Sequence, residues 1–91
     1  RARNNLDRAT LSELFAWTEQ EFLARTEGSA IRRSGYGRWL RNIAVALGNA
    51  PAAPDVVAAL ESRREEPDSV VREHVEWALC RHALQERARA P

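Results

Sequence analysis

Residues 56–79, VVAALESRREEPDSVVREHVEWAL, contain two stretches with helical periodicity and a turn between them. The first stretch has an apolar stripe of Val56, Val57 and Leu60, and Pro54 suits the first turn of its helix. The turn carries Pro67, and Asp68 or Ser69 can cap the helix that follows. That helix carries one apolar stripe of Val71, Val75, Ala78 and His82 and an adjacent one of Val70, Trp77 and Leu84. We therefore predict helices over 54–65 and 69–87.

The rest of the chain is also helical in pattern. Capping boxes at Thr10 and Thr18 predict helices over 10–16 and 19–27, and apolar residues on most sides predict a buried helix over 38–47 that ends at Gly48. The segment 28–37, GSAIRRSGYG, is predicted to be a loop or an irregular helical turn that Ile31 anchors in the core. No stretch alternates with a period of two. We expect one all-α domain over residues 1–91, with about five helices packed as antiparallel neighbours.

Charge is balanced overall but not locally. The 91 residues have a formal net charge of +1, 44% hydrophobic and 30% charged residues, which favours a folded domain over a disordered tail. Residues 28–54 nevertheless contain four arginines and no acidic residue. The middle of the chain is therefore a basic stretch inside a nearly neutral molecule.

That basic stretch is the candidate binding site. Its candidate residues are Ser29, Arg32, Arg33, Ser34, Tyr36 and Arg38. Arginine forks and backbone N–H groups suit phosphate, and Tyr36 could stack on a base or sugar. Arg41, in mid-helix, is the weakest candidate. The alternative is that these arginines pair with Glu19, Glu21, Glu27 or Glu73. Base stacking is also open to Trp17, Trp39 and Trp77, although their helical spacing favours the core.

Other chemistry finds little support in the sequence. His74 and His82 lie about 12 Å apart along a helix at 1.5 Å per residue, too far to share a metal ion, and Cys80 is the single cysteine. Adjacent helical residues such as Glu65 and Glu66 point apart. No catalytic triad order, nucleotide fingerprint or membrane span is present in the sequence. No signal peptide is visible either, since Arg1–Asp7 is polar. We expect a cytoplasmic piece of a longer protein, with no cofactor or membrane contact and no enzymatic activity of its own.

The two C-terminal helices resemble a HEAT repeat, and WLRNIAVALG over 39–48 is a weaker copy. The resemblance implies a HEAT-like antiparallel bundle or short solenoid. It also implies that Arg72 braces the turn before its helix, for which Asp68 is the natural partner.

The chain also resembles a specific family. GSAIRR (28–33), RWLRNIAVALGN (38–49) and VREHVEWAL (71–79), in this order, are similar to the C-terminal helical region of epoxyqueuosine reductase. The resemblance implies a bacterial enzyme that reduces epoxyqueuosine to queuosine at the wobble position of tRNA, with cobalamin and two [4Fe–4S] clusters. With one cysteine, this chain lacks the cysteine runs that ligate such clusters, so the catalytic parts are expected elsewhere.

Two functional hypotheses follow from the sequence. In the first, the chain docks the tRNA anticodon arm while a catalytic domain works on the base. In the second, it is a protein-interaction module without RNA contact, whose partner could be the parent's own catalytic domain. Only phosphate binding should weaken steeply as salt rises.

Overall fold

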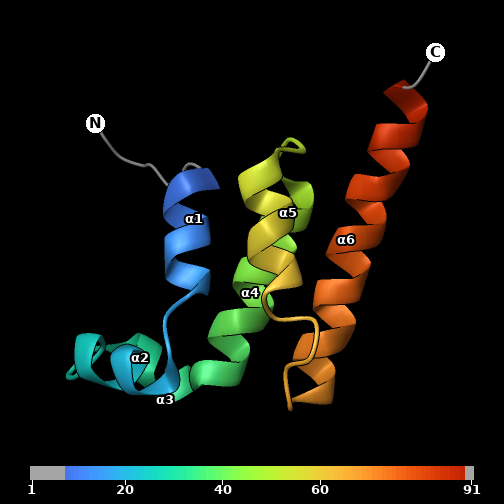
Figure 1. Cartoon of the computed structure of the whole chain (residues 1–91). Coiled ribbons are helices and arrows are strands. Elements are labelled where there is room, and N and C mark those ends of the chain that lie inside the picture. Colours follow the sequence, from blue (N-terminus) through green and yellow to red (C-terminus); the bar gives the residue numbers. More distant parts are fainter. Residues whose placement is uncertain (1–7, 90–91) are drawn as a thin grey trace.

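The computed structural model describes residues 8–89, which fold into six α-helices and contain no β-strand (Figure 1). The helices are α1 (Arg8–Phe15), α2 (Glu19–Arg25), α3 (Ala30–Ser34), α4 (Tyr36–Asn49), α5 (Pro54–Glu61) and α6 (Ser69–Arg89). The all-α prediction is confirmed, and the sixth helix is α3, within the segment predicted to be irregular. The polar start Arg1–Asp7 lies outside the described residues.

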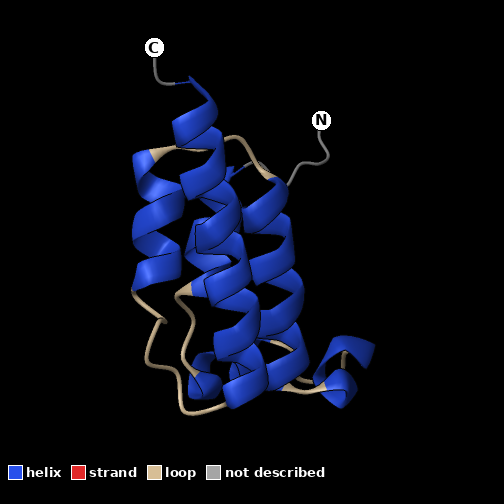
Figure 2. Ribbon diagram, turned by 90° about the vertical axis from the view of Figure 1, so that its right-hand side faces the viewer, coloured by secondary structure: helices blue, strands red, loops and turns tan. Residues whose placement is uncertain are grey.

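Helix α4 is the central helix of the bundle. It packs most extensively against α6 and also against α1 and α5, while α2 and α3 lie beside its first turns at one end of the bundle (Figures 1 and 2). Sequential helices α4, α5 and α6 run in alternating directions, as their short connections predict. The first part of the basic stretch, residues 28–38, is therefore held at the end of the bundle where α4 begins, and we call these residues the basic segment.

One apolar core joins these helices. Its buried members are Leu11, Phe15, Leu40, Ile43, Ala44, Leu47, Val56, Leu60, Val71, Val75 and Ala78. On α6, the stripe of Val71, Val75, Ala78 and His82 is the buried one. The adjacent stripe of Val70, Trp77 and Leu84 is exposed, because α6 has core on one side only.

Several predicted helix ends are confirmed. Thr18 and Glu21 form the reciprocal capping box that was predicted to start α2. The end of α2 differs from the prediction, because the helix stops at Arg25 instead of 27, and Gly28, with a φ of 78°, lies in the turn that follows. The carboxylate of Asp68 accepts hydrogen bonds from the N–H groups of Val70 and Val71, so Asp68 caps α6.

Other ends differ from the prediction. Helix α1 already includes Arg8, so Thr10 lies inside it. Helix α5 ends at Glu61 instead of 65, and residues 62–65 form turns that carry Arg63 back towards α1. Helix α4 starts at Tyr36 and continues through Gly48, which was predicted to end it.

Gly48 lies inside α4 at the point where α6 crosses at close range. A methyl group added to Gly48 would lie 2.6 Å from Cζ3 of Trp77 and 3.1 Å from the Cα of Ala78. Glycine is therefore required for close packing, not for a left-handed backbone.

We predict that a side chain at Gly48 destabilises the fold. Gly48→Ala gains up to about 1 kcal/mol of helix propensity but overpacks the crossing at a cost of about 1–3 kcal/mol. We expect a net loss in the free energy of unfolding, larger for Gly48→Val, measured by urea denaturation. The exposed neighbour provides the control, since Asn49→Ala should change stability by less than about 0.5 kcal/mol. A more stable Gly48→Ala protein would contradict this account.

Candidate nucleic-acid interface

Helix α3 presents the two central arginines of the basic segment. The helix is held between Gly28 and Gly35, whose φ angles are 78° and 93°, and the Ser29 Oγ accepts a hydrogen bond of 3.1 Å from the Ile31 N–H. Arg32 and Arg33 are exposed, and they line a hollow together with Gly28, Ser29 and Ala30. Ser29, Arg32 and Arg33 thus share one surface.

The arginines of this end have no ionic partner. Within residues 8–89, the side chains of Arg32, Arg33 and Arg38 form no ion pair or hydrogen bond, so the predicted alternative of pairing with neighbouring glutamates is not found. The donors of these three guanidinium groups are therefore not used within residues 8–89. Arg41, the weakest candidate, is half-buried.

The structure divides the six candidates. Ser34 and Arg38 lie apart from the α3 hollow, beside an apolar groove that α1, α3 and α4 form. Ile31 also lines this groove and is 48% exposed. The prediction that Ile31 anchors its segment in the core is wrong, because α3 lies at the end of the bundle, where the core does not extend.

Tyr36 faces inward. Its ring is 5.6 Å from that of Phe22, and its hydroxyl donates to the Trp17 carbonyl and accepts from Nη2 of Arg63 at 2.9 Å. Burial raises the pKa of Tyr36, and the nearby Arg63 guanidinium partly offsets that rise. Tyr36 therefore holds the start of α4 against α2. Its stacking on a base stays a prediction, and it would require the ring to leave these contacts.

Arg63 is the residue that the sequence reasoning missed. Its Nε donates to the Phe15 carbonyl at 2.7 Å, its Nη2 donates to the Trp17 carbonyl at 2.8 Å and to Tyr36, and its Nη1 pairs with Glu66 at 2.9 Å. The side chain is only 16% exposed. No pattern marked it, because its partners are mostly backbone carbonyls almost 50 positions away in the chain.

The tryptophans occupy two environments. Trp17 and Trp39 are half-buried and stack with ring centroids 5.3 Å apart. Trp77 is 41% exposed, contrary to the core expectation, because its ring lies on the surface beside Gly48 and under the Arg81 guanidinium.

Arg72 braces the turn before α6 as predicted, but through different partners. Its Nη1 donates to the carbonyls of Glu66 and Pro67 at 2.8 and 3.3 Å, not to the Asp68 carboxylate. Asp68 is instead occupied by capping α6, and Glu66 by Arg63.

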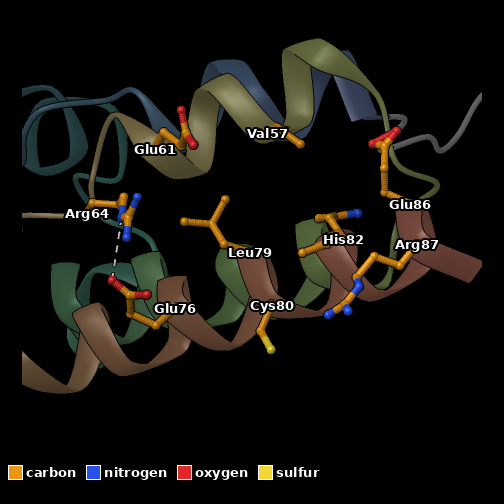
Figure 3. A pocket seen from close by; sticks show the side chains of 10 residues that line it. Val57, Glu61, Arg64, Glu76, Leu79, Cys80, His82, Glu86 and Arg87 are labelled. Carbon is orange, nitrogen blue, oxygen red and sulfur yellow. Dashed lines mark ion pairs between the residues drawn. The ribbon is translucent and has the colours of Figure 1, made fainter.

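His74 and His82, whose spacing already placed them too far apart to share a metal ion, each lie beside a backbone carbonyl. Nδ1 of His74 lies 2.7 Å from the Val70 carbonyl, and Nε2 of buried His82 lies 2.7 Å from the Leu47 carbonyl. Figure 3 shows Cys80 pointing away from the space between α5 and α6 that His82 borders. Among residues 8–89, no three His, Cys, Asp or Glu side chains are placed to hold a metal ion. No helix among these residues is both long and apolar enough to cross a membrane.

The described residues therefore form a small all-α module with exposed, unpaired arginines at one end. Comparison with known proteins relates this module to the epoxyqueuosine reductases. It is 70% identical over 84 residues to that of Xanthomonas campestris, 64% over 80 residues to that of Pseudomonas aeruginosa and 52% over 86 residues to that of Escherichia coli. The matched residues make up 92%, 88% and 94% of this chain and 24%, 22% and 22% of those proteins.

The chain thus spans about a quarter of the length of the curated relatives it matches, and it is related to part of an epoxyqueuosine reductase. The resemblance found in residues 28–33, 38–49 and 71–79 is confirmed. No family model and no solved structure matches this chain.

We predict that Arg63 cannot be replaced by lysine. A single ammonium group cannot reach the Phe15 and Trp17 carbonyls, Tyr36 and Glu66 together. Arg63→Lys should lower the free energy of unfolding by about 2–4 kcal/mol, since hydrogen bonds to a charged, largely buried group are lost. The control is Arg64→Lys, because Arg64 is exposed and its pair with Glu76 at 3.5 Å is open to solvent. Equal unfolding midpoints for the two variants would contradict the role of Arg63.

We predict that Tyr36 ionises above the ordinary tyrosine pKa of about 10. Tyr36 is the single tyrosine of the chain, so phenolate absorbance during an alkaline titration reports it alone. A raised pKa means that the folded state holds the proton longer, so this contribution to stability is present below pH 10 and is lost as pH rises through the folded pKa. The same titration in concentrated urea gives the unfolded reference, and coinciding midpoints would show that the hydroxyl is not held as described.

Proposed function

We propose that this chain is the tRNA-docking part of an epoxyqueuosine reductase. In this proposal the remaining polypeptide reduces epoxyqueuosine to queuosine at the wobble position, and this module holds the anticodon arm. The relatives carry that enzyme name, and they match the chain over most of its length. The observation that carries the docking role is the pair Arg32 and Arg33, exposed and unpaired in a stretch of 27 residues without an acid.

The chemistry of this surface fits an RNA backbone. Two adjacent guanidinium groups can each make two-pronged contacts with phosphate oxygens, and the Ser29 hydroxyl can donate a further hydrogen bond. Phosphate contacts supply affinity and orientation and carry no base sequence. Such a surface would position the arm and leave recognition of the modified base to the catalytic part.

The cofactors would be bound elsewhere in the polypeptide. A [4Fe–4S] cluster takes four cysteine thiolates, whereas this chain contains only Cys80, and residues 8–89 hold no group of metal ligands. The residues present do not fit the two clusters that the resemblance implies, and none is assigned to cobalamin. The role proposed for this chain therefore includes no redox step.

The alternative role is that of a HEAT-like interaction module without RNA contact. The apolar groove beside Arg38 and Ile31 favours it, because an exposed apolar surface suits a protein partner. The two roles involve different surfaces and differ in their response to salt.

We predict that Arg32 and Arg33 set the salt dependence of tRNA binding. In the full-length protein that carries this chain, Arg32→Ala/Arg33→Ala should weaken binding of an anticodon stem-loop. It should also reduce the slope of log affinity against log salt by roughly 1.5, as expected for two lost phosphate contacts. A fluorescence titration at several salt concentrations measures both quantities.

The matched control is Arg64→Ala/Arg87→Ala, which removes the same charge from exposed positions beside the α5–α6 space. Equal slopes for the two double variants would mean that only net charge matters. An unchanged slope for Arg32→Ala/Arg33→Ala would place the RNA on another surface. Arg38→Ala, measured separately, tests whether the groove side contributes.

A further inference from the structure

The apolar groove at the α3 end is a second surface, distinct from the arginine hollow. It has a volume of about 310 Å³ and lies between α1, α3 and α4. Its apolar lining comes from Leu11, Leu14, Ile31, Trp39, Ile43 and Ala46. Ser34, Arg38 and Asn42 supply its polar part. One helix, α3, therefore contributes to the arginine hollow and to the groove.

Two features indicate that the groove is an unfilled contact surface. Ile31 exposes 48% of its surface there, which costs hydrophobic free energy in the free module. Arg38 is exposed and has no ion pair within residues 8–89. An apolar occupant that also carries a carboxylate would satisfy both.

We propose that the groove receives a segment of the same polypeptide outside these 91 residues, one that presents one or two large apolar side chains and a carboxylate that pairs with Arg38. This inference rests on the proposed function, in which the chain is part of a longer enzyme. The relatives are about four times as long as their matched region. In a polypeptide of that length, the residues outside the matched region provide a large surface for contact with the groove.

Size and charge support this occupant. A cavity of about 150 Å³ accommodates benzene, so the groove, at about twice that volume, has room for one or two large side chains. Arg38 belongs to the acid-free stretch 28–54, so a carboxylate from outside the stretch would complement it. An RNA strand fits less well, because the apolar lining would strip water from phosphates without replacing their hydrogen bonds.

Docking would also orient the RNA surface. Ile31 and Arg32 are neighbours on a five-residue helix, and successive helical side chains point in different directions. A segment that packs on Ile31 would hold α3 in place while Arg32 and Arg33 stay free. The groove would thereby set the position of the docking arginines relative to the catalytic part.

Photo-crosslinking in the full-length protein tests this proposal. The photoreactive residue p-benzoylphenylalanine replaces Asn42, which is exposed at the groove, or Asn49, which is exposed on the same helix but does not line it. We expect Asn42 alone to give an intramolecular crosslink, to one peptide outside these 91 residues that contains acidic and large apolar residues. Crosslinks between two copies, or equal yields from both positions, would overturn the proposal.

A charged residue in the groove gives an independent test. Ile31→Glu should lower the crosslink yield from Asn42 at least about tenfold, since burying a carboxylate costs more than the 1.4 kcal/mol that corresponds to tenfold. Leu23→Glu, at a position 37% exposed on α2 and outside the groove, should leave the yield unchanged. An unchanged yield in Ile31→Glu would overturn the proposal.

The crosslinking is done without RNA, so it can fail independently of the tRNA titration. If crosslinking succeeds and the salt slope is unaffected by Arg32 and Arg33, the groove assignment stands and the RNA role fails. If the slope changes and Asn42 gives no specific crosslink, the RNA role stands and the groove assignment fails.

Discussion

The arrangement of this chain depends on the guanidinium group of Arg63. Its donors join the Phe15 carbonyl at the end of α1, the Trp17 carbonyl before α2 and the Tyr36 hydroxyl at the start of α4. These partners come from segments that share no regular hydrogen-bonding pattern, and a buried carbonyl needs a donor from somewhere. A planar fork with five donors is the side chain that can serve them together. Arg63 therefore fixes where the peripheral helices meet the bundle, and with them the basic segment.

The same logic holds at the other end of α4. Its last carbonyls lack helical partners, and side chains of α6 supply the donors. Arg81 Nε donates to the Gly48 carbonyl at 3.1 Å, and His82 Nε2 lies 2.7 Å from the Leu47 carbonyl, a bond that needs the proton on Nε2. Gly48 brings α6 close enough for both bonds. The central helix is thus fastened at each end by residues that follow it in the chain.

The sequence predicts the interactions that are local in the chain and misses those that are not. The stripe of Val71, Val75, Ala78 and His82 and the capping box at Thr18 involve residues within a few turns of one helix, so their spacing predicts them. The role of Gly48 depends on its close contact with Ala78 of another helix. In the sequence alone, a glycine that ends a helix looks the same as one that lets a neighbouring helix approach. The prediction that Ile31 is buried was wrong for a related reason. An apolar side chain is buried only where the fold places the core around it. Of the candidate site, composition indicated the arginines, but only the three-dimensional arrangement showed that they are unpaired and separated Arg32 and Arg33 from Arg38.

That separation matters for how such a module can act. With a net charge of +1, the chain has no strong overall field to attract RNA, so any electrostatic attraction is local to the acid-free segment. Two or three phosphate contacts give modest affinity, and on the proposed function their main effect is to fix the orientation of the anticodon arm. Orientation is useful only if the arginines are themselves fixed relative to the catalytic part. A five-residue helix between two glycines cannot provide that rigidity alone, whereas a helix whose opposite side is packed against the rest of the enzyme can.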